Sequence, residues 1–233
     1  LPEHITPERC VEYAESRRQK GIQNGTIRRE LKDLKAAVNK FARNAGAQFE
    51  FPPEPPPKDI YVTKDEYRKI REQARHIPHL LLFLELAIGT GSRSIALLQL
   101  TWSQIDFERR LIDLGTGTEN KKRAIVPMTN TVEKALREAF QKRGECPHVI
   151  QYRDKQIDVI RVSFKRACAR AGFPHVTPHA LRHSAAVWMA EAGVPMSEIS
   201  QFLGHTSTAI TEKVYARYSP DYLRGAAGHL EID

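Results

Sequence analysis

"PHALRHSAAVWMAEAG", residues 178–193, is typical of a buried helix, yet it carries two histidines and an arginine. Thr177 offers an N-cap and Pro178 suits the first helical position. Side chains three or four residues apart lie on the same face of a helix, so His179 and Arg182 point the same way. Two such donors on a rigid element predict a binding site for an anion.

The overall charge indicates what kind of anion this is. The 233-residue chain has a formal net charge of +8, which favours a nucleic acid as partner. No apolar run approaches the ~20 residues that cross a bilayer, and the first residues show no signal-peptide pattern. We therefore expect no membrane partner and a cytoplasmic location, nucleoid-associated in a bacterium. The three cysteines have no metal-ligand spacing, and we expect neither disulfides nor a metal.

A proline-rich stretch, "FPPEPPPKD" at residues 51–59, divides the chain. Its prolines disfavour both helix and sheet and predict a stiff linker. Residues 1–50 show two amphipathic helical patterns, which we interpret as part of a larger helical domain. Residues 60–233 predict a mainly α-helical domain with one small antiparallel β element (α+β), the hairpin 110–128. Helices are expected at 6–21, 24–46, 62–74, 79–88, 94–100, 131–143, 156–171, 178–192, 196–203 and 209–217.

Other polar residues stand where apolar segments end. Arg93 follows the "GTGS" turn after an apolar run, and a guanidinium held there suits a two-pronged grip on phosphate oxygens. The remaining candidates are Lys121 and Lys122 in the hairpin turn, His205 directly after "QFLG", and Tyr215 and Tyr218 in "TEKVYARYSPDYL". Each residue by itself most often has an ordinary packing or surface role. The order in which they follow one another carries the functional prediction.

Taken in order, "TGSR", "LLQLTW", "NKKRAIVPM", "HALRH", "LGH" and "VYARYSPDYL" resemble the tyrosine recombinases, also called phage integrases, over residues 60–224. The resemblance implies the catalytic-domain fold of that family, preceded by part of its core-binding domain, which clamps DNA. It also implies five catalytic residues: Arg93, His179, Arg182, His205 and the nucleophile Tyr215.

The resemblance further implies a site-specific recombinase or integrase. Such an enzyme cleaves and rejoins DNA strands through a 3′-phosphotyrosine intermediate, without metal or ATP. The implied partner is double-stranded DNA, bound by a homotetramer on paired sites, and we expect a monomer without DNA.

The chemistry of these residue types agrees with those roles. Attack on a phosphodiester gathers negative charge on its non-bridging oxygens, and two arginines and a histidine directed there stabilise that charge. A phenol is a weak nucleophile at neutral pH and needs a proton acceptor. We expect His179 to be that acceptor, His205 to hold the phosphate, and Lys121 to protonate the leaving 5′ oxygen. Cationic side chains then do the work of a metal, so we expect no cofactor.

The chain departs from the family pattern at two positions. Ala96 stands where the family commonly has an acidic residue that supports the first arginine. Glu119 stands where many relatives have the catalytic lysine. We select Lys121 as that lysine, with Lys122 as the neighbouring alternative.

Two further aromatic or basic residues lie close to the predicted site in sequence. Tyr218 falls on the same helix face as Tyr215, and the context "VYARYSPDYL" favours Tyr215 as the nucleophile. We expect His183 to pack beside the site or support it rather than act in it.

Two other patterns in the sequence could indicate different classes of function, a metal site and a nucleotide-binding loop. His175, His179 and His183 step by four like metal ligands, but prolines place His175 outside the helix and the glutamate of H-E-x-x-H is absent. "GTGTENKK" does not meet the spacing of a nucleotide-binding P-loop. A DNA-binding relative that has lost catalysis and a strand-swivelling type IB topoisomerase remain as alternatives.

Overall fold

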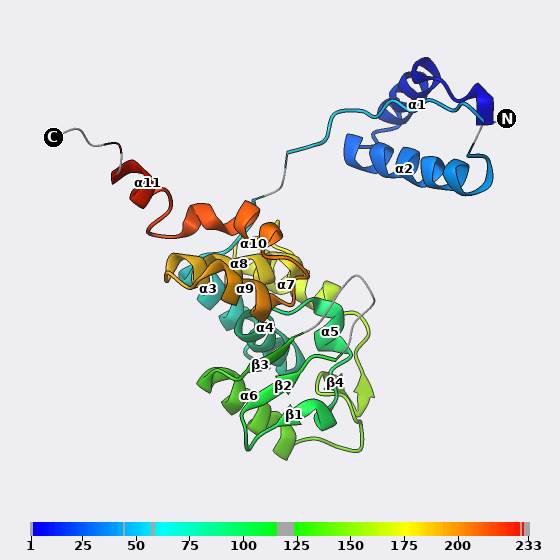
Figure 1. The fold of residues 1–233 in the computed structure, drawn as a ribbon. Coiled ribbons are helices and arrows are strands. Elements are labelled where there is room, and N and C mark those ends of the chain that lie inside the picture. Colours follow the sequence, from blue (N-terminus) through cyan, green and yellow to red (C-terminus); the bar gives the residue numbers. More distant parts are fainter. Residues whose placement is uncertain (1, 44, 57–58, 116–123, 229, 231–233) are drawn as a thin grey trace. The chain divides into compact units, whose positions relative to one another are not determined.

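The computed structural model describes residues 2–43, 45–56, 59–115, 124–228 and 230 (Figure 1). The chain divides into two compact units, Leu1–Asp59 and Ile60–Asp233. Most described residues are helical, and the strands are short and antiparallel, which confirms the predicted α+β class. None of the described helices combines the length and apolar character needed to cross a membrane.

The first unit is a pair of helices with a small core. α1 (Pro7–Gln19) begins at Thr6, whose hydroxyl accepts a hydrogen bond from the Arg9 backbone N–H, and α2 spans Asn24–Phe41. The buried residues are Cys10, Ala14, Ile27 and Leu31, with Ile5, Ile22, Phe49 and Phe51 packed against them. Farther along the apolar stripe of α2, Leu34 and Phe41 stay exposed. Residues of this unit therefore cover only the first half of the stripe.

The second unit is built around α4 (Pro78–Thr90), which is buried on nearly all sides. This explains why its sequence is apolar without a helical period. α4 packs against four other helices: α3 (Lys64–Ala74), α5 (Ser94–Leu98), α6 (Asn130–Gln141) and α8 (Pro178–Glu191). The remaining helical segments are α7 (Arg161–Arg170), α9 (Met196–Leu203), α10 (Thr208–Tyr215), the 3-10 turn η3 (Ala216–Tyr218) and α11 (Arg224–Gly228).

A three-stranded antiparallel sheet lies on the same unit, in the order β1 (Ile105–Asp106), β2 (Leu111–Asp113), β3 (Ile125–Pro127). The predicted hairpin corresponds to β2 and β3, where Asp113 pairs with Ile125. Residues 116–123, which include Glu119, Lys121 and Lys122, lie outside the described residues.

A second pair of strands corrects one predicted helix. β4 (Gln151–Tyr152) pairs with β5 (Lys155–Gln156), and α7 begins only at Arg161, so the helix predicted from residue 156 starts too early. Gln156 is held in the strand by pairing with Gln151, and its amide donates a hydrogen bond to the Leu98 carbonyl at 3.1 Å. The strand pairing and the hydrogen bond to the distant Leu98 override the local helical pattern.

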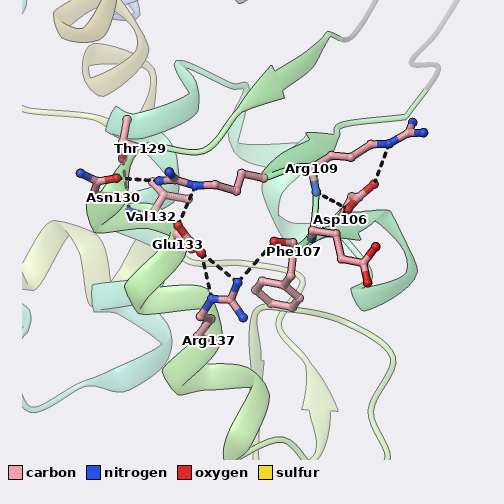
Figure 2. Close-up of polar contacts among 10 residues, drawn as sticks. Asp106, Phe107, Arg109, Thr129, Asn130, Val132, Glu133 and Arg137 are labelled. Atoms are coloured by element: carbon pink, nitrogen blue, oxygen red, sulfur yellow. Dashed lines mark hydrogen bonds and ion pairs between the residues drawn. The ribbon is translucent and has the colours of Figure 1, made fainter.

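The sheet is fastened to α6 by an ionic network (Figure 2). Glu133 forms ion pairs with Arg110 at 2.7 Å and with Arg137 at 2.9 Å. Arg110 also donates to the Asn130 side chain, and Arg137 donates to the Phe107 carbonyl at 3.3 Å. The network links the start of β2 and the turn after β1 to residues Asn130–Arg137 of α6.

α8 is fixed by contacts with the segment that precedes α3. The Val62 N–H donates to the Ser184 hydroxyl at 2.8 Å, and the Trp188 indole N–H donates to the Val62 carbonyl at 3.0 Å. Val62 and Ser184 are fully buried. α8 is therefore held on one side by this segment and on another by α4, and it forms a firm base for the side chains it carries.

Candidate active site

Arg182 is the most deeply buried charged side chain of the predicted site. α8 begins where the Thr177 hydroxyl accepts a hydrogen bond from the Ala180 backbone N–H, and Arg182 follows with 4% of its surface exposed. Its Nη1 donates to the Gly91 carbonyl at 2.9 Å, while its buried Nη2 has no hydrogen-bond partner among the described residues. Burial and then the charge of Arg93 lower the pKa of Arg182 to about 10. The site therefore holds a buried cation with an unused donor.

Arg93 reaches the same place from the end of α4. Gly91 ends that helix with a left-handed backbone (φ 57°), and a Cβ built on it would lie 2.7 Å from Cδ2 of Leu203. Only glycine suits such a position, because side chains disfavour positive φ and the space is filled. The chain turns at once, and Arg93 becomes the half-buried N-cap residue of α5.

His179 lies one turn before Arg182 on α8 and is exposed. Partial burial of the ring lowers its pKa, and the charges of Arg182, His183 and Arg93 lower it further. His179 and Arg93 both line a hollow of ≈ 690 Å³ that runs along α5, α7 and the start of α8. The two side chains thus face one solvent-accessible space.

His205 follows directly after Gly204, the residue that ends α9. Gly204 has a left-handed backbone (φ 65°), and the His205 N–H donates to the Ser200 carbonyl at 2.9 Å. Its Nδ1 lies 2.8 Å from the hydroxyl of Thr211, which is buried on α10. Burial and then the charges of Arg182 and Arg93 lower the pKa of His205 to about 4.

Tyr215 is the last residue of α10, and 7% of its surface is exposed. Its hydroxyl lies 3.1 Å from Nδ1 of His183, and the two rings are 5.1 Å apart between centroids. The Tyr215 hydroxyl is also close enough to Arg182 to favour the charged form of that arginine. The predicted nucleophile is therefore beside the cationic cluster.

The structure brings five of the six predicted site residues together, from four separate elements. They are Arg93 before α5, His179 and Arg182 on α8, His205 after α9 and Tyr215 on α10. The sixth, Lys121, lies outside the described residues. Ala96, which stands in the place of the family's acidic residue, is buried in α5.

The sequence did not predict three contacts of this site, although it placed His183 beside the site. Thr211 binds the His205 ring, the Gly91 carbonyl binds Arg182, and His183 contacts the predicted nucleophile. Thr211 lies four residues before Tyr215, so a shared helix face was the available signal. The other two contacts join parts of the chain that are far apart in sequence.

The arrangement is suited to an anion. No carboxylate among the described residues pairs with Arg182, and burial of an uncompensated cation is unfavourable until a negative charge arrives. Across the described ranges, no three His, Cys, Asp or Glu side chains gather in a way that could hold a metal ion. The cluster can thus bind a phosphate through nitrogen donors, with a phenol at its edge.

Residues 61–221 match the model of the Phage integrase family. Tyrosine recombinase XerC of Bifidobacterium longum (strain DJO10A) is 33% identical over 162 residues, which cover 62% of this chain and 45% of that protein. Tyrosine recombinase XerA of Thermococcus onnurineus is 30% identical over 226 residues, covering 90% of this chain and 76% of that one. The chain thus spans about half the length of the XerC relatives it matches.

Solved structures share the fold. The Tn1549 transposon integrase in complex with circular intermediate DNA aligns with a TM-score of 0.75 at 20% identity, over 97% of this chain and 86% of that one. The crystal structure of XerA recombinase aligns with a TM-score of 0.62 at 24% identity, over 100% of this chain and 86% of that one.

Proposed function

Because the chain belongs to the phage integrase family, we propose that it cleaves and rejoins double-stranded DNA at specific sites through a 3′-phosphotyrosine on Tyr215. One observation carries this proposal. The buried Arg182 has an unused donor, lies close to the charge of Arg93 and to the His205 imidazole, and is beside the Tyr215 hydroxyl. A phosphodiester supplies the negative charge that this cluster lacks.

The first step joins the tyrosine to the DNA. The Tyr215 oxygen attacks the scissile phosphorus, and the bond from phosphorus to the 5′ oxygen breaks. Arg93, Arg182 and His205 stabilise the charge that develops on the non-bridging oxygens, with His179 at the open edge of the same site. The phosphotyrosine retains the energy of the bond, so a 5′ hydroxyl from another strand can reverse the step without ATP.

The leaving 5′ oxygen needs a proton, and we assign this role to Lys121 from the sequence. Lys122 is the alternative. The cationic side chains supply the charge stabilisation that Mg²⁺ supplies in other phosphoryl-transfer enzymes, so the proposed reaction uses no metal.

The proposed partner is a pair of DNA duplexes held by four copies of the chain, with a monomer in the absence of DNA. Residues 1–50 would contribute part of a DNA clamp, residues 51–59 a linker and residues 60–233 the catalytic domain. The net charge of +8 and the solved complexes of the Tn1549 integrase and of lambda integrase with DNA support this partner. Binding should weaken steeply as salt rises, because phosphate neutralisation releases counterions, and a flat salt response would contradict DNA as the partner.

The deciding experiment is a covalent-adduct assay. The chain is mixed with a DNA site selected from a random duplex pool, carrying a nick beside the scissile phosphate so that the cleaved end diffuses away. An adduct that survives SDS is expected with the wild type and with Tyr218→Phe, and it should be absent with Tyr215→Phe. The lack of any adduct on DNA that the chain binds would favour the non-catalytic alternative. Relaxation of supercoils without strand exchange would favour the topoisomerase.

A further inference from the structure

The histidine at the nucleophile is not the one that the sequence pattern favours. Nδ1 of His183 lies 3.1 Å from the Tyr215 hydroxyl, within hydrogen-bond distance. His179 is one turn earlier on α8 and lines the hollow with Arg93. Two histidines of one helix therefore face different places: His179 faces the hollow that Arg93 also lines, and His183 faces the Tyr215 phenol.

Aromatic neighbours surround the His183 ring where it meets Tyr215. Tyr61, from the segment before α3, meets the His183 ring edge-on at 6.3 Å between centroids, and Tyr61 in turn contacts Tyr218 at 5.6 Å. His183 itself is half-buried, and Tyr215 is buried. Among the described residues, the titratable groups near His183 include Tyr61, Tyr215 and, on its own helix, His179. This packing keeps the imidazole beside the phenol before any DNA is bound.

We propose that His183 is a catalytic residue that accepts the phenolic proton when Tyr215 attacks DNA. The proposal rests on the function assigned to Tyr215 above. As the bond from the Tyr215 oxygen to phosphorus forms, the proton moves to Nδ1 of His183. The bond to the 5′ oxygen breaks, and that oxygen takes a proton from the general acid, assigned above to Lys121. In the rejoining step His183 returns its proton to the phenol.

The proposal requires one tautomer of the imidazole. Nδ1 can receive a proton only if the neutral ring carries its own proton on Nε2, so that the phenol donates and Nδ1 accepts. This can be tested without DNA by nitrogen NMR of the histidine rings. In Tyr215→Phe the hydroxyl is absent, and we expect a shift of the His183 Nδ1 resonance from that of a hydrogen-bonded acceptor. An unchanged resonance, or a protonated Nδ1 in the neutral wild-type ring, would overturn the proposal.

The kinetic test compares His183→Asn with His179→Asn as the matched variant on the same helix. Asparagine can hydrogen-bond near the position of Nδ1 but cannot take up a proton. Each variant is given the nicked DNA site described above, once with the ordinary 5′ oxygen and once with sulfur in its place. A thiolate leaves without help from an acid, so the sulfur substrate isolates the role of the proton acceptor.

We expect His183→Asn to slow adduct formation about 100-fold or more on both substrates, the usual range for loss of a general base. The rate of adduct formation by His183→Asn should also no longer fall at acidic pH. In the wild type it should fall there, because a protonated imidazole cannot accept the phenolic proton. His179→Asn should slow adduct formation, but its rate should still fall at acidic pH as in the wild type. DNA affinity and thermal midpoint, measured on each variant, establish that the folded protein is being compared.

Two results would overturn the role of His183 and leave the proposed function standing. One is a His183→Asn rate within about threefold of the wild type, and the other is loss of the acid limb in His179→Asn alone. A wild-type chain that forms no adduct on DNA it binds would instead remove the proposed function itself, and the role of His183 with it.

Discussion

The two helices that meet at the candidate site, α8 and α10, are held in very different ways. Eight of the 14 residues of α8 are buried, and Val62 fastens the helix through two hydrogen bonds. Only two of the eight residues of α10 are buried, Thr211 and Tyr215. Both of these contact a histidine of the site. The proposed phosphate-binding side is thus part of the core, whereas α10, which carries the proposed nucleophile, packs on the site through the two residues that contact its histidines.

This difference separates two requirements of phosphoryl transfer. Donors that stabilise developing charge are most effective when they are fixed before the reaction, and α8 meets that requirement. A nucleophile that must be joined to DNA and released again benefits from a support that can adjust. Substitutions on α8 should therefore affect stability and catalysis through different residues, while those on α10 should affect catalysis with little loss of stability.

The largest effect is expected at Arg182. Arg182→Met keeps an unbranched side chain of similar length but removes the charge, and adduct formation should fall by at least about 100–1000-fold. The same change removes a buried cation that has no carboxylate partner among the described residues, so the thermal midpoint should stay level or rise. Calorimetry beside the adduct assay measures both. A fall of several degrees would mean that the hydrogen bond to Gly91 outweighs the buried charge.

Paired truncations of apolar residues compare the supports of the two helices directly. Leu181 on α8 is 0% exposed, and Leu181→Ala should lower the free energy of unfolding by about 2–5 kcal/mol. Ile210 on α10 is 51% exposed, and Ile210→Ala should change it by less than about 0.5 kcal/mol. Urea unfolding of the two variants gives these values. Similar losses in both would contradict the contrast between α8 and α10.

A subtler change on α10 tests how His205 is oriented. Thr211→Val keeps the shape of the side chain and removes the hydroxyl that lies 2.8 Å from Nδ1 of His205. Loss of one hydrogen bond, worth about 1 kcal/mol, should slow adduct formation about five- to tenfold. Thr211→Ser retains the hydroxyl and serves as the control. Equal rates for valine and serine at this position would show that the contact does not orient the ring.

The last prediction is a pH dependence of stability. The pKa of His205 is lowered to about 4 in the folded protein, from 6.5 as its ordinary value. Between these values the unfolded chain binds the proton more strongly, so the free energy of unfolding falls as pH drops from about 6.5 toward about 4. His205→Gln lacks this titration, and its curve should be flatter over the same window. Parallel curves for the two proteins would rule out a contribution from His205.

Much of the fold could be predicted because its helices have strong local patterns. Apolar runs, N-caps such as Thr177, and glycine stops such as Gly204 mark elements within a few residues. Five of the proposed site residues could be selected for a related reason. Each stands at the end of an element or on a helix face, in an order that resembles one family.

The remaining features depend on contacts that the sequence does not display. Strands of two or three residues, such as β1 and β5, are too short to show alternation. The late start of α7 follows from the pairing of β5 with β4. The hydrogen bond between Tyr215 and His183 spans 32 residues in the sequence. Which of the two histidines on α8 contacts the phenol is decided by how α10 packs on α8.

Gly91 has an evolutionary consequence out of proportion to its size. Its carbonyl accepts a hydrogen bond from Arg182, and its backbone turn places Arg93 at the start of α5. The end of α9, which precedes His205, occupies the space that a Cβ at position 91 would need. A position with no side chain therefore sets the spacing of three others. In a saturation library selected for recombination, position 91 should tolerate substitution as poorly as the nucleophile. Attempts to evolve new DNA preferences should vary the surface around it and leave this glycine in place.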